Sequence, residues 1–272
     1  WGLSMSEIEP KPPSLAGAGP TPTPSALWLI QAGVSIRIID QHASTGEASR
    51  AMVLQARTLE FYQQLGIAEQ VIASGIKVEG LQIVQNHQPI VTARFGDLGT
   101  GLSPYPFPLS FPQDEHEQLL EAALQAFGVY IEWNTELLSF EDLDTTVTTL
   151  LKTPAGEESF TCSYLCGCDG AKSTVRHQLG FSFEGGTYQQ QFYVADTEVD
   201  PSDSPPYLRA CLEEGLFCLA FPLRHSGMLR FIGIVPPEHA ERQDLSFADL
   251  QPHVESLTGI LVKNTHWFSV YQ

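Results

Sequence analysis

Apolar and polar positions along the first third of the chain switch between helical and strand spacing. Residues 26–30 are apolar throughout and end at Gly33, which predicts a short buried helix with a glycine cap. The β-branched residues of 34–39 predict a strand that stops at Asp40. A helix and a strand joined at a glycine form half of a βαβ unit. The apolar spacing of residues 57–65 predicts a second helix.

The remaining pattern changes from mixed to mostly strand-like. Residues 76–95 alternate as a hairpin does, with residues 85–89 at the turn, and Asp114 is placed to cap a helix that runs to Gly128. From about residue 137 the pattern predicts strands at 145–152, 159–166, 192–199, 216–222 and 228–235. We therefore expect an α/β chain, α+β overall, with an α/β domain of the nucleotide-binding type followed by a sheet-rich domain.

The chain of 272 residues, 43% hydrophobic, is long enough for two domains with separate cores. We expect residues 1–75 and 101–185 to form the first, α/β domain in two parts. Residues 76–100 are expected as a hairpin that belongs with the second domain, and residues 186–272 as that sheet-rich domain, incomplete at its C-terminus. The sequence sets no expectation for the oligomeric state.

Charge and cysteine usage narrow the classes of partner. A formal charge of −18 repels polyphosphate backbones and anionic membrane surfaces, so we expect no nucleic acid or membrane as a partner. The sequence holds no apolar run of membrane-spanning length and no signal-peptide pattern, which predicts a cytoplasmic protein. The five cysteines are an odd number without a disulfide framework. Cys166 and Cys168 have no second pair or nearby histidines, so we expect no metal site.

Two short stretches carry candidate chemistry. Gly17-Ala-Gly19 begins a dinucleotide-binding fingerprint, and Asp40 follows 23 residues after Gly17, where an acidic residue can bind a ribose hydroxyl. The alternative is a chance glycine pair with a surface aspartate. In the second stretch, Asp169 and Gly170 follow a short apolar segment, and a helix is expected to start near Ser173. By physics alone this could equally be a turn with a capped helix.

Three stretches together resemble the FAD-dependent aromatic-ring hydroxylases, the single-component flavoprotein monooxygenases related to phenol, hydroxybenzoate and polyketide hydroxylases. They are "GAGPT" with "VSIRIID", then "EASRAMVLQARTLEFYQQLGI", then "CGCDGAKSTVRHQLGFSFEGG". The resemblance covers roughly residues 10–272. It implies an FAD-binding Rossmann-like domain and a sheet-rich substrate domain. The cofactor-binding residues that it implies are Gly17 and Gly19 at the pyrophosphate, Asp40 at the adenosine ribose, Arg50 near the phosphates, Gln113 beside the flavin, and Asp169 with Gly170.

The same resemblance implies hydroxylation of a phenolic or other electron-rich ring, with FAD as cofactor, NAD(P)H as reductant and O2 as the oxygen source. No residue is singled out as a catalytic acid or base. Tyr193, Tyr207 and His225 are candidates only in that they could contact a phenol. A plain NAD-dependent dehydrogenase would need only the glycine pair and Asp40, and it leaves "CDGAKSTVR" unexplained.

The chain also departs from the family's pattern. Pro22 replaces the third glycine of the fingerprint, and with Pro24 it removes donors that a phosphate would use, so we expect the helix to begin late, with Thr23 as its cap. Pro12 and Pro13 are expected to weaken the first strand. The family's later Gly-Asp motif is missing before Gln272, which suggests truncation. We therefore expect weak or absent FAD retention, and the alternative function is a catalytically inactive remnant of such an enzyme.

Overall fold

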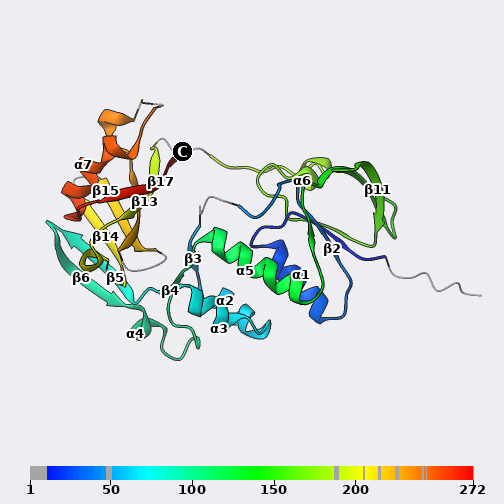
Figure 1. Cartoon of the computed structure of the whole chain (residues 1–272), viewed down its shortest axis with the longest axis horizontal. Helices are drawn as coiled ribbons and strands as arrows, with labels where there is room; N and C mark the ends of the chain where they lie inside the picture. Colours follow the sequence, from blue (N-terminus) through cyan, green and yellow to red (C-terminus); the bar gives the residue numbers. More distant parts are fainter. Residues whose placement is uncertain are drawn as a thin grey trace, which may run out of the picture. The chain divides into compact units, whose positions relative to one another are not determined.

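The computed structural model describes residues 11–46, 51–186, 190–204, 206–213, 216–223, 227–240, 242 and 244–271. Contacts within the chain divide it into two compact units, whose elements are labelled in Figure 1. The first unit comes from Trp1–Ser49 and Gln113–Glu184, and the second from Arg50–Pro112 and Gly185–Gln272. This division groups residues 50–75 and 101–112 with the second unit, which differs from the boundaries that we expected from the sequence.

A four-stranded parallel sheet organises the first unit, in the order β12-β1-β2-β8. Its strands are β1 (Ser14–Ala16), β2 (Arg37–Ile39), β8 (Ile131–Glu132) and β12 (Leu165–Gly167). The expected weakening of the first strand does not prevent its formation, because β1 is buried and pairs on both sides. Pro13 precedes it, and its carbonyl still accepts a hydrogen bond from the Arg37 N–H at 3.0 Å. A proline at the start of a strand removes only a donor.

Helices and a second sheet complete the first unit. The helices are α1 (Pro22–Gln31), α5 (Gln113–Ala126) and α6 (Thr174–Gln178), and the antiparallel sheet is β9 (Glu136–Asp142), β10 (Val147–Thr153) and β11 (Gly156–Cys162). Figure 1 shows α1 and α5 side by side, in agreement with their contacts. The core that joins the two sheets contains Ala16, Ile39, Leu137, Leu151 and Val175.

Two sequence-based helix boundaries in this unit were wrong. Helix α1 begins at Pro22 with Thr21 as N-cap, two residues before the expected start at Pro24. The fixed φ of proline suits the first helical position, so Pro22 opens the helix rather than delaying it. Asp114 lies inside α5, because that helix already begins at Gln113.

A seven-stranded sheet organises the second unit, in the order β17-β13-β16-β15-β14-β5-β6. Its strands are β5 (Gly80–Gln85), β6 (Gln88–Arg94), β13 (Phe192–Glu198), β14 (Tyr207–Glu213), β15 (Leu216–Pro222), β16 (Met228–Ile234) and β17 (Asn264–Tyr271). The predicted hairpin is present as β5 and β6, and Asn86 and His87 turn the chain with positive φ. Strand β5 pairs with β14 in parallel, which joins the hairpin to this sheet.

Helix α7 (Phe247–Thr258) covers one face of this sheet and was not predicted from the sequence. A capping box of Ser246 and Asp249 starts it, and Phe247, Leu250 and Val254 pack on the sheet (Figure 1). The smaller elements are β3 (Val53–Leu54), β4 (Ile76–Lys77), β7 (Leu109–Ser110), α2 (Ala56–Gln64), α3 (Ala68–Ser74), α4 (Phe95–Gly99) and two 3₁₀ turns (Pro201–Asp203, Pro237–His239). The mixed α/β fold class predicted from the sequence is confirmed.

Candidate functional site

Three loops leave the carboxyl edge of the parallel sheet next to one another. They are Gly17–Gly19 after β1, Asp40 with His42 after β2, and Cys168–Gly170 after β12; we call them the sheet-edge loops. The Gly17 N–H donates to the Ile39 carbonyl at 2.8 Å, and the Cys168 N–H donates to the Ala16 carbonyl at 2.8 Å. The carboxyl edge of a parallel sheet is where α/β folds bind ligands. The structure therefore brings together five of the residues singled out from the sequence: Gly17, Gly19, Asp40, Asp169 and Gly170.

The two glycines of the first loop have different structural roles. Gly17 has φ +106°, and a Cβ at this position would lie 2.4 Å from the Cys168 carbonyl oxygen. Only glycine combines that backbone conformation with so close an approach. A Cβ at Gly19 would meet no atom within 4 Å. Gly17 thus closes the loop against its neighbour, whereas Gly19 leaves one side of the backbone open to a ligand.

The turn from this loop into α1 contains few N–H donors. Pro22 and Pro24 have none, and the Thr23 N–H points to the Gly19 carbonyl at 3.4 Å. The Thr23 hydroxyl donates to the carbonyls of Ala18 and Gly19, at 3.0 and 2.9 Å. Among the residues that the structure describes, the N–H groups of Gly19 and Thr21 make no hydrogen bond. These two groups are available to an anion.

Asp40 holds the first loop in place. Its Oδ2 accepts a hydrogen bond from the Ala18 N–H at 2.8 Å. Its Oδ1 accepts one from the His42 N–H at 2.9 Å and lies 2.7 Å from His42 Nδ1. The Asp40 side chain is 13% exposed, whereas the His42 side chain is 72% exposed. The carboxylate therefore links the loops that follow β1 and β2.

Asp169 organises its own loop and the start of α6. Its Oδ1 accepts a hydrogen bond from the Ser173 hydroxyl at 2.5 Å, and its Oδ2 accepts from the N–H groups of Thr174 and Val175 at 2.7 and 3.3 Å. Ser173 is the N-cap, so α6 starts near Ser173 as the sequence predicted. Gly170 has φ +77° and open space where a Cβ would lie. The capped-helix alternative is thus present here, whatever else Asp169 does.

Gln113 lies at the start of α5 and reaches a carboxylate that the sequence did not single out. Its amide donates to Glu117 Oε1 at 2.7 Å, and Glu117 Oε2 accepts from the Gly46 N–H at 3.0 Å. The adjacent His116 is 3% exposed, and burial lowers its pKa to about 4. Arg50, the remaining predicted cofactor residue, lies outside the described residues, as does His225.

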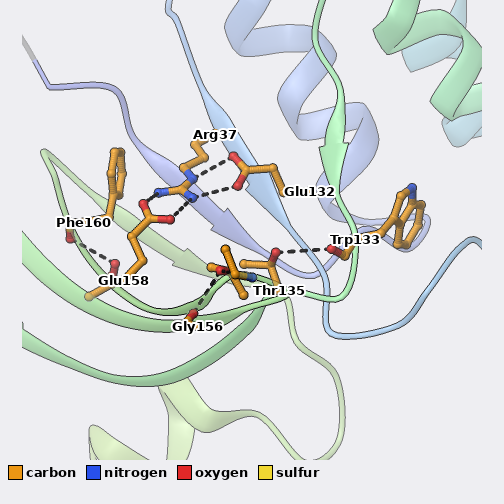
Figure 2. A network of polar contacts seen from close by, with 10 residues as sticks. Arg37, Glu132, Trp133, Thr135, Gly156, Glu158 and Phe160 are labelled. Atoms are coloured by element: carbon orange, nitrogen blue, oxygen red, sulfur yellow. Dashed lines mark hydrogen bonds and ion pairs between the residues drawn. The ribbon is translucent and has the colours of Figure 1, made fainter.

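An arginine network ties the sheets of the first unit together. Figure 2 shows the Arg37 guanidinium between two glutamates. It donates to both oxygens of Glu132 at 2.8 and 2.7 Å, and to Glu158 at 2.8 Å. The guanidinium also lies 4.4 Å from the ring centre of Phe160. Hydrogen bonding to Arg37 lowers the pKa of Glu158. This network fixes β2, which Asp40 follows directly, to β8 and β11.

A family model described as FAD binding domain matches residues 14–263. The chain belongs to this family. Among its curated relatives is a flavin-dependent monooxygenase of Mycobacteroides abscessus, 31% identical over 271 residues that cover 95% of this chain and 56% of the relative. Another is 6-methylpretetramide 4-monooxygenase of Streptomyces rimosus, 33% identical over 188 residues that cover 68% of this chain and 33% of the relative. The chain thus spans about half or less of the length of these relatives.

Solved structures give the same fold for this member of the FAD-binding family. The p-nitrophenol 4-monooxygenase of Pseudomonas putida superposes with a TM-score of 0.84, 21% identity, and coverage of 96% of this chain and 67% of that one. A ternary complex of aklavinone-11 hydroxylase with FAD and aklavinone gives a TM-score of 0.79 at 21% identity, and covers 96% of this chain and 53% of that one. At these identities the likeness shows the fold.

Other features bear on the remaining expectations. Tyr193, weighed above as a possible contact to a phenol, is fully buried in the core beneath α7. Among the described residues, no group of His, Cys, Asp and Glu is arranged to hold a metal ion. In the same part of the chain, no helix has both the length and the apolar character needed to span a membrane.

Proposed function

We propose that this chain forms the FAD-binding part of a monooxygenase that hydroxylates a phenolic or other electron-rich aromatic ring with NAD(P)H and O2. The observation that carries the proposal is the arrangement of the sheet-edge loops in a chain of the FAD-binding family. The relatives' names support the substrate class, since one is a pentachlorophenol 4-monooxygenase of Sphingobium chlorophenolicum.

The residues present fit a dinucleotide at the sheet-edge loops. The open side of Gly19 lets a pyrophosphate approach the backbone, and the N–H groups of Gly19 and Thr21 can donate to its oxygens. Asp40 lies at the end of the next strand and keeps lone pairs for a ribose hydroxyl. We propose the following cofactor-binding residues: Gly17, Gly19, Asp40, Arg50, Gln113, Asp169 and Gly170.

When bound, FAD would supply the redox chemistry of ring hydroxylation, with NAD(P)H as the reductant and O2 as the oxygen source. The chain's own residues bind the cofactor and orient it. Gly17 and Asp40 fix the loop that faces the phosphates, and Asp169 holds the neighbouring loop in the shape that its helix start requires. His116 of α5 stays neutral near pH 7 because burial lowers its pKa to about 4, so it adds no positive charge to this helix.

The partners and location follow from this proposal. The small-molecule partners are an aromatic substrate, NAD(P)H and O2. All five cysteines are free in the structure, which together with a nicotinamide co-substrate supports a cytoplasmic location.

The test is a titration of the purified chain with FAD, in which binding is monitored through flavin absorbance and through quenching of flavin fluorescence. We expect saturable binding of one FAD per chain. Asp40→Ala should weaken it at least about tenfold, because the loss of a charged hydrogen-bond acceptor releases the loop. Asp142→Asn, a change at the exposed end of β9 in the same unit, is the matched control. Equal affinity of Asp40→Ala and wild type would refute the assignment of the site.

A further inference from the structure

Two thiols lie side by side at the carboxyl end of β12. The sulfur atoms of Cys166 and Cys168 are 3.7 Å apart. Cys166 is exposed and Cys168 is partly buried, whereas the other three cysteines, Cys162, Cys211 and Cys218, are fully buried. β12 is an edge strand of its sheet, so only β1 holds it by backbone pairing. The pair is therefore accessible to a small reagent and belongs to a strand end that can shift.

The surroundings of the pair favour thiol redox chemistry over metal binding. Two thiolates do not complete a tetrahedral zinc site, and the described residues provide no third ligand near them. A disulfide needs the two sulfurs at about 2.05 Å, an approach of about 1.6 Å from their present separation. Residues two apart along a strand have Cα atoms about 6.6 Å apart, close to the upper limit for a disulfide. Bond formation would therefore have to contract the strand end.

That strand end is pressed against the glycine loop. The Cys168 carbonyl oxygen occupies the space that a Cβ of Gly17 would need, and the Cys168 N–H donates to Ala16. On the other side, a Cβ at Gly167 would lie 2.6 Å from Val175 of α6. Gly167 thus packs closely against Val175, and the Cys168 carbonyl packs closely against Gly17. A contraction there must be transmitted to Gly17 and the loop that follows it.

We propose that Cys166 and Cys168 form a reversible disulfide, and that its formation displaces the Gly17–Gly19 loop and weakens FAD binding. The effect on FAD rests on the proposed function, whereas the disulfide itself does not. The chain would then carry a redox-sensitive modification site at the edge of its nucleotide-binding loop.

Hydrogen peroxide is the oxidant in this proposal. The Cys166 sulfur attacks one peroxide oxygen, the O–O bond breaks, and water leaves with the thiol proton, which gives a sulfenic acid. The Cys168 sulfur then attacks the Cys166 sulfur, the S–O bond breaks, and a second water leaves with the Cys168 proton. The two thiols lose two electrons and the peroxide becomes two waters. Burial, with smaller effects from Cys166 and Asp169, raises the pKa of Cys168 to about 12, so the exposed Cys166 reacts first and the second step is slow.

The first experiment maps the thiols of the native chain after peroxide treatment and alkylation. We expect a linked Cys166–Cys168 peptide, lighter by two hydrogens and restored by dithiothreitol. Cys166→Ser should abolish the link. Cys168→Ser should instead accumulate a sulfenic acid that dimedone traps. Cys211→Ala, in the other unit, should keep the link. Absence of a linked peptide, or protection of both thiols by stoichiometric zinc, would overturn the proposal.

The second experiment tests the coupling to the loop, first without the cofactor and then with it. Hydrogen exchange of residues 17–21 should accelerate in the oxidised chain and return to its original rate after reduction. The dissociation constant for FAD should rise at least about fivefold on oxidation, the lower end of ordinary coupling between sites. Unchanged exchange in a linked protein would refute the displacement. If the reduced chain binds no FAD, the proposed function fails, while the disulfide map and the exchange rates still decide this inference.

Discussion

An alanine at Gly17 would put a methyl group where the Cys168 carbonyl oxygen already lies. The added Cβ would be 2.4 Å from that oxygen and 2.8 Å from the carbonyl carbon, and neither is a flexible side-chain atom. The φ of +106° adds a backbone penalty of roughly 1–2 kcal/mol for a residue with a Cβ. Relief of the close contact requires the two loops to move apart, which costs further free energy. We therefore expect Gly17→Ala to lower the free energy of unfolding by about 3 kcal/mol, a large effect for one methyl group.

The assay is urea denaturation without FAD. Unfolding is monitored through the fluorescence of Trp28 and Trp133, which lie in the same unit as Gly17. Gly19→Ala is the matched control, because its Cβ would meet nothing within 4 Å. We expect this control to change stability by less than about 0.5 kcal/mol but to weaken FAD binding, since its methyl occupies the open side of the loop. A Gly17→Ala protein as stable as wild type would refute the close contact between the loops.

Three further outcomes follow from buried or networked charges. Burial holds the pKa of His116 at about 4, below its ordinary value, so His116 binds a proton more readily in the unfolded chain. The free energy of unfolding should therefore fall by about 2 kcal/mol between pH 7 and pH 5 in urea titrations. His116→Gln should flatten that pH dependence. Asp196→Asn should cost about 3–5 kcal/mol in the same assay, because it leaves the fully buried Arg230 guanidinium without its carboxylate. Arg37→Lys cannot bridge Glu132 and Glu158 in the same way and should cost about 1–2 kcal/mol, an effect that high salt reduces.

Local patterns predicted the elements whose signals are local. The start of α6 near Ser173 and the β5–β6 hairpin were confirmed, because a helix start and a tight turn depend on neighbouring residues. Helix α7 was missed although Ser246 and Asp249 have the spacing of a capping box, and Pro252 inside the helix obscured its apolar period. Strand β17 was also missed, since it is partly exposed and its place is fixed by pairing with the distant β13.

At the candidate site too, features set by nearby residues were predictable, and contacts between distant residues were not. The glycine pair and Asp40 were predicted as neighbours, because a strand-loop-helix-strand unit returns the chain to the same sheet edge. Contacts across the sequence were not foreseeable: Arg37 meets Glu132 and Glu158 at separations of 95 and 121 residues. Glu117 could have been noticed four residues after Gln113 on one helix face, but its bond to Gly46 depends on tertiary packing.

The prolines after the glycine loop determine how strongly that loop can hold an anion. A helix normally leaves its first four N–H groups without partners, here those at Thr21, Pro22, Thr23 and Pro24. The two prolines have no N–H group, and the Thr23 N–H points to the Gly19 carbonyl. Only the N–H groups of Thr21 and Gly19 therefore remain available to an anion among the described residues of this turn. The first strand and the start of α1 are therefore intact, and what the loop lacks is N–H donors for a phosphate.

Pro24→Ala restores one donor without changing the fold, and we expect it to tighten FAD binding about tenfold, the value of a hydrogen bond to a charged group. Pro12→Ala, before β1, adds a donor away from the loop and should leave the affinity unchanged in the same titration. If both variants bind FAD like wild type, the helix N-terminus does not contribute to phosphate binding in this chain.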